Sequence, residues 1–509
     1  MTQDDAVHAA IKNIHSIAVI GAGPSGAGCV KALLKENKFA KVQAFEKRPG
    51  FGGLWNHTDE TDALTTPVPS EKSTLDIEPI FNEQTESYKW ASPVYDYLDT
   101  NVPKDIMTYA GIKFPEECPV FPHRSDVLKY MVEYSKELIP YIRFNTKVVD
   151  LTLLPDQKWQ VTSRLVVKET KGGKVSSSAP GFQDTVEIYD AVVIATGNYD
   201  VPYIPDRQGM AEWAEAYPGT ITHVKSYRNP QQFEAAKGKI VVVGNSASGG
   251  DLAYQLATEL KRDIYKSKRS ENLLPAGQSE LIKDVPDIVK FNVKDRSLEL
   301  KDGSILHDVD HVIFATGYLK SFPFLNHLNE TDKPLLTDGH KVHGNYQHII
   351  LYNYPNLAII GLARYVLPTR TSETQGCWLA KIWSGRVALP SVEEMQEWEA
   401  KRVEWKGNGK QFHDLLFPED VHYCNTLNGQ VLKSVENEDT ENKGLIPHTW
   451  DKEQTALRGS IKGIKEAYIQ YRAKTGKLAH SYQELIDAHF IDSFIISDED
   501  LRAKGFDFK

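Results

Sequence analysis

The sequence predicts an α/β protein with two dinucleotide-binding domains, the second inserted in the first, plus a helical C-terminal tail. A short apolar strand runs into a glycine-rich turn and a helix at residues 17–34, and the same pattern returns at residues 239–257. Each unit is followed by a strand that ends in Ala-Thr-Gly, at residues 195–197 and 315–317. A strand, a glycine turn and a helix in this order open a βαβ unit, so we expect two Rossmann-like domains.

The bulk composition is that of an ordinary globular protein. The chain has 509 residues, 41% of them hydrophobic, which is enough for two or three domains with their own cores. A net charge of −10 argues against nucleic-acid binding, which usually needs a basic surface. The acidic N-terminus is unlike a signal peptide and no apolar stretch is long enough to cross a bilayer, so we expect no membrane span. The cysteines have no metal-binding spacing and fit a reducing, cytoplasmic location; they are Cys29, Cys118, Cys377 and Cys424.

The order of strand and helix patterns indicates how the domains follow one another. Residues 142–195 alternate as β-strands do, with a polar hairpin tip at residues 171–181, and residues 345–388 return to strands and a helix. Beyond about residue 390 the pattern is charged and helical. We therefore expect a first domain that is split around the second. The expected bounds are 1–205 for the first part of the first domain, 206–330 for the inserted domain, 331–430 for the return segment and 431–509 for a helical C-terminal extension.

The first glycine loop, Gly21–Gly26, has the spacing GxGxxG. Its first glycine allows a tight turn, the second lets the backbone approach a pyrophosphate, and the third allows close packing of helix on strand. Glu46 ends the next strand, where a carboxylate can accept hydrogen bonds from ribose hydroxyls and would repel a 2′-phosphate. The loop therefore suits FAD or NAD rather than NADP. Its residues are Gly21, Gly23, Pro24, Ser25 and Gly26.

The second glycine loop, Gly244–Gly249, has serine in place of the middle glycine. The hydroxyl of Ser246 can itself donate to a phosphate, although Ser246 and Ser248 also stand at the expected helix start, where serine is a good cap. The next strand ends in cations instead of an acid. Cations at this place favour a 2′-phosphate, hence NADP over NAD, with a solvated basic loop as the alternative. These cations are Lys266, Lys268 and Arg269.

The contrast between the two loops predicts a tightly bound flavin in the first and NADPH in the second, with hydride passing from nicotinamide to flavin. In disulfide reductases built this way, a redox-active cysteine pair accepts the electrons, and this chain has no such pair. Oxygen, or an external acceptor such as a quinone or a protein, remains as the destination of the electrons.

The segment YPGTITHVKSY, from Tyr217 to Tyr227, lies between the two loops and matches FxGxxxHxxxY, with Tyr217 in the place of Phe. It resembles the fingerprint of the flavin-containing monooxygenases, which are class B flavoprotein monooxygenases. Taken alone, His223 could be a structural histidine. Further segments look like family segments over roughly residues 15–425, and they point to the soluble fungal branch. They are GGLW at 52–55, ATGNYDVPYIP at 195–205, FATGY at 314–318 and LAKIWSG at 379–385.

The resemblance implies FAD and NADPH as cofactors, with O2 and a small nucleophilic substrate as partners, and it is compatible with a homodimer. In the family, oxygen adds to the reduced flavin as a C4a-hydroperoxide, from which an amine nitrogen or a sulfide or thiol sulfur takes one oxygen atom. Residues 92–109, SPVYDYLDTNVPKDIMTY, resemble the segment with the active-site asparagine, so Asn101 is implied as the catalytic residue. Its amide can orient the nucleotide without adding charge. A turn asparagine ahead of Val102 is the alternative.

Further cofactor-binding residues are implied by the same resemblance. The alternatives are that Arg124 forms a surface ion pair and that Gln375 lies on the surface of a helix. No metal is expected, because the pairs His307/His311 and His340/His343 have no matching carboxylates. Expected to line FAD are Leu54, Trp55, Arg124, Val148 and Gln375; expected near the NADPH phosphates are Ser246, Ser248, Gly249 and Asp251. The remaining expected contacts are Gly53, Thr100, Val102, Thr196, Gly197, His223, Thr316 and Gly317.

Three other functions compete with an N- or S-oxygenating enzyme. A Baeyer–Villiger monooxygenase would use the same cofactors on ketones, but that class typically carries Trp followed by Pro or Asp where this chain has Tyr227 and Arg228. A flavin reductase would pass its electrons to a quinone or a protein partner. A non-catalytic nucleotide-binding protein would bind no flavin.

Overall fold

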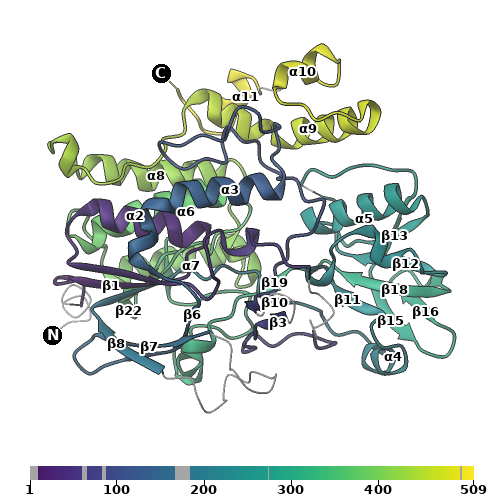
Figure 1. Cartoon of the computed structure of the whole chain (residues 1–509), viewed down its shortest axis with the longest axis horizontal. Coiled ribbons are helices and arrows are strands. Elements are labelled where there is room, and N and C mark those ends of the chain that lie inside the picture. The colour runs from purple at the N-terminus through teal and green to yellow at the C-terminus, as the bar shows by residue number, and fades with distance from the viewer. Residues whose placement is uncertain are drawn as a thin grey trace.

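A computed structural model describes residues 10–59, 66–82, 87–166, 184–272, 274–492 and 496–508. The expected hairpin tip at 171–181 lies outside these residues. The described chain forms two halves, each built on a mainly parallel sheet, and the C-terminal helices run along the top of the molecule in Figure 1.

The first half centres on a seven-stranded sheet of order β20-β21-β22-β9-β1-β2-β5. The last five strands of that order are parallel. β9 precedes the second half in the chain and β22 follows it, yet the two are paired, so the predicted split of the first domain is confirmed. The bounds are β1 Ser16–Ile20, β2 Lys41–Phe45, β5 Ile142–Arg143, β9 Ala191–Ile194, β20 Asn345–Tyr346, β21 Ile350–Leu351 and β22 Tyr354–Ile359.

Both faces of this sheet are covered, which explains why its strands are continuous apolar runs. In β1, Ile17 and Val19 face one core cluster, and Ala18 and Ile20 face another. Helices cover the first face: α2 Pro24–Glu36, α3 Arg124–Ser135, α6 Pro368–Trp383, α7 Val392–Lys406 and α8 Glu419–Lys433. The second face packs on an antiparallel sheet, β6 Thr146–Leu153, β7 Trp159–Leu165 and β8 Asp184–Tyr189, and on the 3-10 helix η5 Pro323–Glu330.

The second half repeats this plan with a five-stranded parallel sheet of order β11-β18-β12-β13-β14. Its strands are β11 Ile221–His223, β12 Lys239–Val243, β13 Ile264–Ser267, β14 Ile282–Val285 and β18 Val309–Phe314; its helices are α4 Met210–Ala216 and α5 Ala247–Leu260. A small antiparallel sheet is added by β15 Ile288–Asn292, β16 Ser297–Leu300 and β17 Ile305–Leu306. Two further pairs are β10 Val201–Pro202 with β19 Tyr318–Leu319, and β3 Ile80–Asn82 with β4 Ser87–Lys89.

The C-terminal tail is helical, as the sequence predicts, and it is part of the core of the first half. It forms α9 Lys452–Thr475, α10 Tyr482–Asp487 and α11 Asp498–Ala503. Ile461, Ile464 and Tyr468 of α9 belong to the same apolar cluster as the residues of α2 and α6. Among the described residues, the helices are all too short or too polar to cross a membrane.

Candidate cofactor-binding and active site

The two glycine loops have the same geometry. Gly21 has φ +105°, and a Cβ on it would lie 2.5 Å from the carbonyl oxygen of Ala195. Gly244 has φ +126°, and a Cβ there would lie 2.5 Å from the carbonyl oxygen of Ala315. Each loop therefore passes directly against the alanine of the Ala-Thr-Gly segment that ends a neighbouring strand. This contact gives the repeated Ala-Thr-Gly a physical reason, and it places Thr196–Gly197 and Thr316–Gly317 beside the two loops.

Each loop leads into a helix whose N-terminus is left without a side-chain cap. The N-cap of α2 is Gly23, with Pro24 at the first position, and the N-cap of α5 is Ser246. The hydroxyl of Ser246 makes no capping hydrogen bond, so the capping alternative is not what this serine does here. Free N–H groups and the positive end of the helix dipole at both places suit the phosphates of a dinucleotide.

The carboxylate of Glu46 is fixed against the first glycine loop. Glu46 is buried, and its oxygens accept hydrogen bonds from the backbone N–H of Ala22 at 2.7 Å and of Arg48 at 2.8 Å. A carboxylate has about four acceptor positions, so two remain for ribose hydroxyls. The residues present here fit an adenosine ribose that lacks a 2′-phosphate.

The GGLW segment lies against the first loop. It forms the 3-10 helix η1, Gly53–Trp55, and a Cβ on Gly53 would lie 2.8 Å from the Cα of Gly23. This places Leu54 and Trp55 beside the loop that would hold the FAD pyrophosphate.

Helix α6 supplies two polar side chains behind the first loop. The hydroxyl of Ser25 lies 3.0 Å from that of Ser372. Gln375 is fully buried, which excludes the helix-surface alternative: its Oε1 accepts from the N–H of Gly361 at 3.1 Å, and its Nε2 donates to the Tyr423 hydroxyl at 2.9 Å.

Two other residues that we expect to contact FAD, Val148 and Arg124, already contact other groups of the protein. The side chain of Val148, on β6, is buried in the apolar cluster that also contains Phe45. Arg124 begins α3, and its Nε donates to the backbone carbonyl of Asp96 at 3.4 Å, with a guanidinium nitrogen 3.9 Å from the Asp96 carboxylate. The ion-pair alternative for Arg124 therefore describes a real contact, although a long one.

His223 is held entirely by backbone groups. It is buried; its Nδ1 accepts from the N–H of Lys225 at 3.2 Å, and its Nε2 therefore donates to the carbonyl oxygen of Gly317 at 3.0 Å. Burial lowers the pKa of His223 to about 3, so the ring is neutral. His223 thus fixes the second Ala-Thr-Gly segment, which is the structural reading that the sequence left open.

The expected 2′-phosphate-binding cations all have acidic neighbours. Lys266 and Lys268 share Asp284, at 3.3 and 2.8 Å, because β13 and β14 are paired side by side. The Nε of Arg269 lies 2.9 Å from Asp287. Lys266 lies in β13, and Lys268 and Arg269 directly follow it beside the second loop, but a phosphate would have to compete with these carboxylates.

Asn101 lies in a segment that is attached to both halves. Within the described residues, no group hydrogen-bonds to its carboxamide. Upstream, the Tyr95 hydroxyl donates to Asp251 of α5, and Asp251 also accepts from Gln255 at 3.1 Å. Downstream, the N–H of Thr100 donates to the carbonyl of Pro122 at 2.9 Å, next to α3. The Thr100 hydroxyl donates to the carbonyl of Val102 at 2.8 Å, which closes the turn that presents Asn101.

A charged network around Asp200, which the sequence did not reveal, also joins the two halves. Asp200 lies 2.6 Å from the Lys47 ammonium, and the ammonium of buried Lys225 donates to the Asp200 carbonyl at 2.5 Å. Burial opposes ionisation of Asp200, but Lys47 and Lys225 outweigh it and hold its pKa well below the usual range. Only the adjacency of Asp200 to the Ala-Thr-Gly segment could have drawn attention to it in the sequence.

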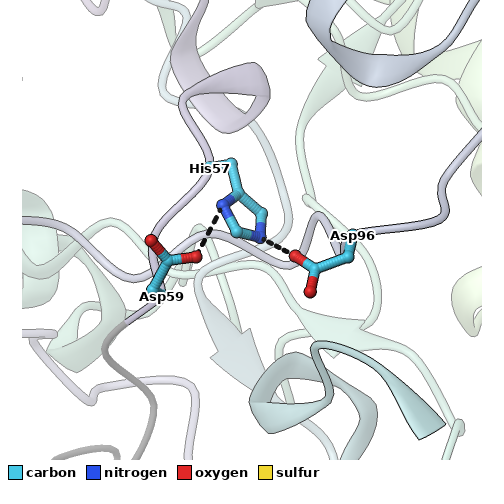
Figure 2. Close-up of side chains that lie close together, drawn as sticks. All are labelled: His57, Asp59 and Asp96. Carbon is cyan, nitrogen blue, oxygen red and sulfur yellow. Dashed lines mark ion pairs between the residues drawn. The ribbon is translucent and has the colours of Figure 1, made fainter.

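Figure 2 shows the one group of described side chains whose ligand atoms lie close enough together to hold a metal ion: His57, Asp59 and Asp96. The imidazole bridges the two carboxylates, at 3.3 Å to Asp59 and 2.9 Å to Asp96. Burial and then the nearby guanidinium groups of Arg124 and Arg228 lower the pKa of His57. Because the same guanidinium groups would repel a metal ion, and because the lowered pKa keeps the imidazole neutral, this group is better described as a polar cluster around His57.

Comparisons with known proteins agree with this arrangement. The family described as flavin-binding monooxygenase-like matches residues 62–278 and 279–430, and the NAD(P)-binding Rossmann-like domain matches residues 19–98. The thiol-specific monooxygenase of Saccharomyces cerevisiae is 30% identical over 465 residues, covering 88% of this chain and 92% of that protein. A flavin-containing monooxygenase of Arabidopsis thaliana is 30% identical over 439 residues, covering 82% of this chain and 85% of that protein.

Among solved structures, the S-allyl-L-cysteine S-oxygenase of Allium sativum superposes with a TM-score of 0.67 at 23% identity, covering 93% of this chain and 97% of that one. At this identity the likeness shows the shared fold. The match of the family over most of the chain shows more: this protein belongs to the flavin-binding monooxygenase-like family, and it is a monooxygenase with FAD and NADPH as its cofactors.

Proposed function

We propose that the protein oxygenates a soft nucleophile, namely an amine nitrogen or a sulfide or thiol sulfur. The observation that carries the proposal is the position of Asn101. Its uncharged amide, which has no hydrogen-bond partner among the described residues, stands in a segment that is attached to α5 of the second half and to α3 of the first. The amide thus offers a donor and an acceptor where the two nucleotides would meet, and it adds no charge there.

The residues of the chain hold and orient the cofactors, and the cofactors carry out the redox chemistry. When bound, FAD and NADPH supply the electrons that activate O2. The first glycine loop and Glu46 would hold the FAD nucleotide, and the second loop with Ser246 would hold the NADPH phosphates. The amide of Asn101 would hydrogen-bond to the nicotinamide side of the site without a charge that could trap a proton.

Product analysis tests the proposed substrate class. The purified yellow protein is supplied with NADPH and O2 together with a tertiary amine, a thioether, a thiol or a ketone. We expect an N-oxide or an S-oxygenated product in proportion to the NADPH consumed. An ester from the ketone alone would make it a Baeyer–Villiger enzyme. NADPH consumption with only peroxide, or only with an added quinone, would make it an oxidase or a reductase.

The basic cluster gives a test of nucleotide choice. Replacing Lys266, Lys268 and Arg269 together with methionine is expected to raise the Kd of NADPH by on the order of tenfold or more, because the 2′-phosphate loses its charge-assisted partners. The Kd of NADH, which has no 2′-phosphate, should hardly change. Asp284→Asn should act in the opposite direction, since it releases the two lysines. Kd values for both nucleotides measure this, and an unchanged preference in both variants would assign the 2′-phosphate to other groups.

The cytoplasmic location and the homodimer also remain proposals. All four cysteines are buried free thiols, which supports a reducing compartment. Light scattering of the purified holoenzyme would decide between monomer and dimer.

A further inference from the structure

The C-terminal tail lies beyond residue 430, where the family match ends, yet its longest helix contacts the segment that carries Asn101. In Figure 1, α9 runs across the top of the molecule, above α3 of the first half and toward α5 of the second. The ammonium of Lys465 donates to the carbonyl of Thr100 at 2.7 Å, and Arg472 lies 2.7 Å from the carboxylate of Asp99. One helix of the tail thus holds the two residues that precede Asn101.

Lys465 is a buried cation with a specific use. It is 5% exposed, and its ammonium lies 4.6 Å from the ring centroid of Phe121 and 5.4 Å from that of Tyr468. Burial lowers its pKa to about 8, with the carboxylates of Asp99 and Asp251 acting in the opposite direction. A lysine is rarely buried unless its charge is partnered.

The carbonyl that Lys465 binds belongs to the peptide unit between Thr100 and Asn101. Because a peptide unit is planar, fixing this oxygen fixes the orientation of the bond that leads into Asn101. The peptide that leads into Asn101 is therefore held by a residue 365 positions away in the chain.

Further contacts from the tail hold the same segment directly and through Val120, whose carbonyl accepts from the N–H of Lys104 at 2.9 Å. The hydroxyl of Tyr482 donates to Asp105 at 2.6 Å, and the N–H of Val120 donates to the carbonyl of Ala479 at 2.9 Å. On the other side, the ammonium of Lys462 reaches the carbonyl of Asn272 in the second half at 3.3 Å. Helix α9 therefore touches both nucleotide-binding halves as well as the segment between them.

We propose that Lys465 is a positioning residue for the oxygenation, and that the tail contributes to the active site in this way. The ammonium of Lys465 sets the orientation of the Thr100–Asn101 peptide and so orients the Asn101 amide. This inference rests on the proposed role of Asn101. A loosened amide would leave the nucleotides bound but would let activated oxygen escape as peroxide instead of reaching the substrate.

The experiment compares three variants of the full-length holoenzyme. Lys465→Met keeps the length of the side chain and removes the charge. Lys474→Met is the matched control, because Lys474 is an exposed lysine of the same helix whose ammonium lies over the ring of Phe490. Arg472→Gln removes only the half-exposed pair with Asp99, so this variant folds even if Lys465→Met does not.

Two readouts are measured: hydrogen exchange of the backbone amides in residues 98–106, and oxygenated product formed per NADPH consumed. In Lys465→Met we expect exchange at least about tenfold faster in this segment. Product per NADPH should fall by about tenfold or more, with peroxide rising to match and with FAD content and the rate of reduction by NADPH unchanged. Arg472→Gln should change both readouts in the same direction by about twofold, and Lys474→Met should match the wild type.

Unchanged exchange in the segment would overturn the inference, and so would faster exchange with unchanged product yield. If Asn101→Ala loses oxygenation while Lys465→Met keeps it, the proposed function stands and this inference fails. If the wild type oxygenates no nucleophile, the proposed function fails, and the exchange rates alone decide whether the tail orders the segment. If Lys465→Met does not fold, an Arg472→Gln enzyme with wild-type exchange and yield overturns the inference.

Discussion

Asn101→Ala is expected to lower the rate of product formation by on the order of 100-fold, which is what the loss of one preorganised hydrogen-bond donor costs in enzymes. FAD binding should be unaffected, because Glu46 and the first glycine loop lie in other segments of the chain. The amide has no protein partner among the described residues, so its removal leaves no buried group unsatisfied there and the fold should keep its stability. NADPH oxidation should continue, with peroxide in place of oxygenated product.

The measurement is the ratio of oxygenated product to peroxide at saturating NADPH, together with the flavin content of the purified protein. Asn437→Ala is the matched control, because Asn437 is an exposed asparagine just after α8. A full yield of oxygenated product from Asn101→Ala would remove this residue from the site. A colourless protein would show instead that Asn101 holds the flavin.

Gly21→Ala and Gly244→Ala are expected to separate the two cofactors. Both positions combine a φ that only glycine adopts readily with a Cβ 2.5 Å from a backbone carbonyl, so an alanine must displace the loop. Strain of this kind costs roughly 1–3 kcal/mol before the clash is counted, which alone raises a Kd by about 5- to 150-fold. The Gly21→Ala protein should no longer bind FAD. The Gly244→Ala protein should keep its FAD and its yellow colour, but NADPH should no longer reduce the flavin.

Flavin absorbance, FAD titration and the rate of anaerobic reduction by NADPH distinguish these outcomes. Gly463→Ala is the control, because this glycine sits inside α9 with open space where a Cβ would lie, and the same substitution should there stabilise the fold by about 0.5–1 kcal/mol. If Gly21→Ala retained FAD and Gly244→Ala lost it, the assignment of the two loops would have to be reversed.

Much of the fold could be predicted from the sequence because its signals are local. A strand, a glycine turn and a helix occupy some twenty consecutive residues, and each was found where it was predicted. The interruption of the first domain by the second followed from the order of these units, and the pairing of β9 with β22 confirmed it. The site was less accessible, because the pattern at Asn101 is a turn that had meaning only through a family resemblance.

What the sequence by itself determined is therefore the plan: two nucleotide-binding halves, an acid at the first loop and a basic cluster at the second. The tertiary structure alone decided how those charges are used. It set Asp284 against Lys266 and Lys268 by pairing β13 with β14, it turned His223 toward the carbonyl of Gly317, and it placed α9 over the Asn101 segment. The reason is that such contacts join residues far apart in the chain, and burial selects them only once the halves and the tail have packed together.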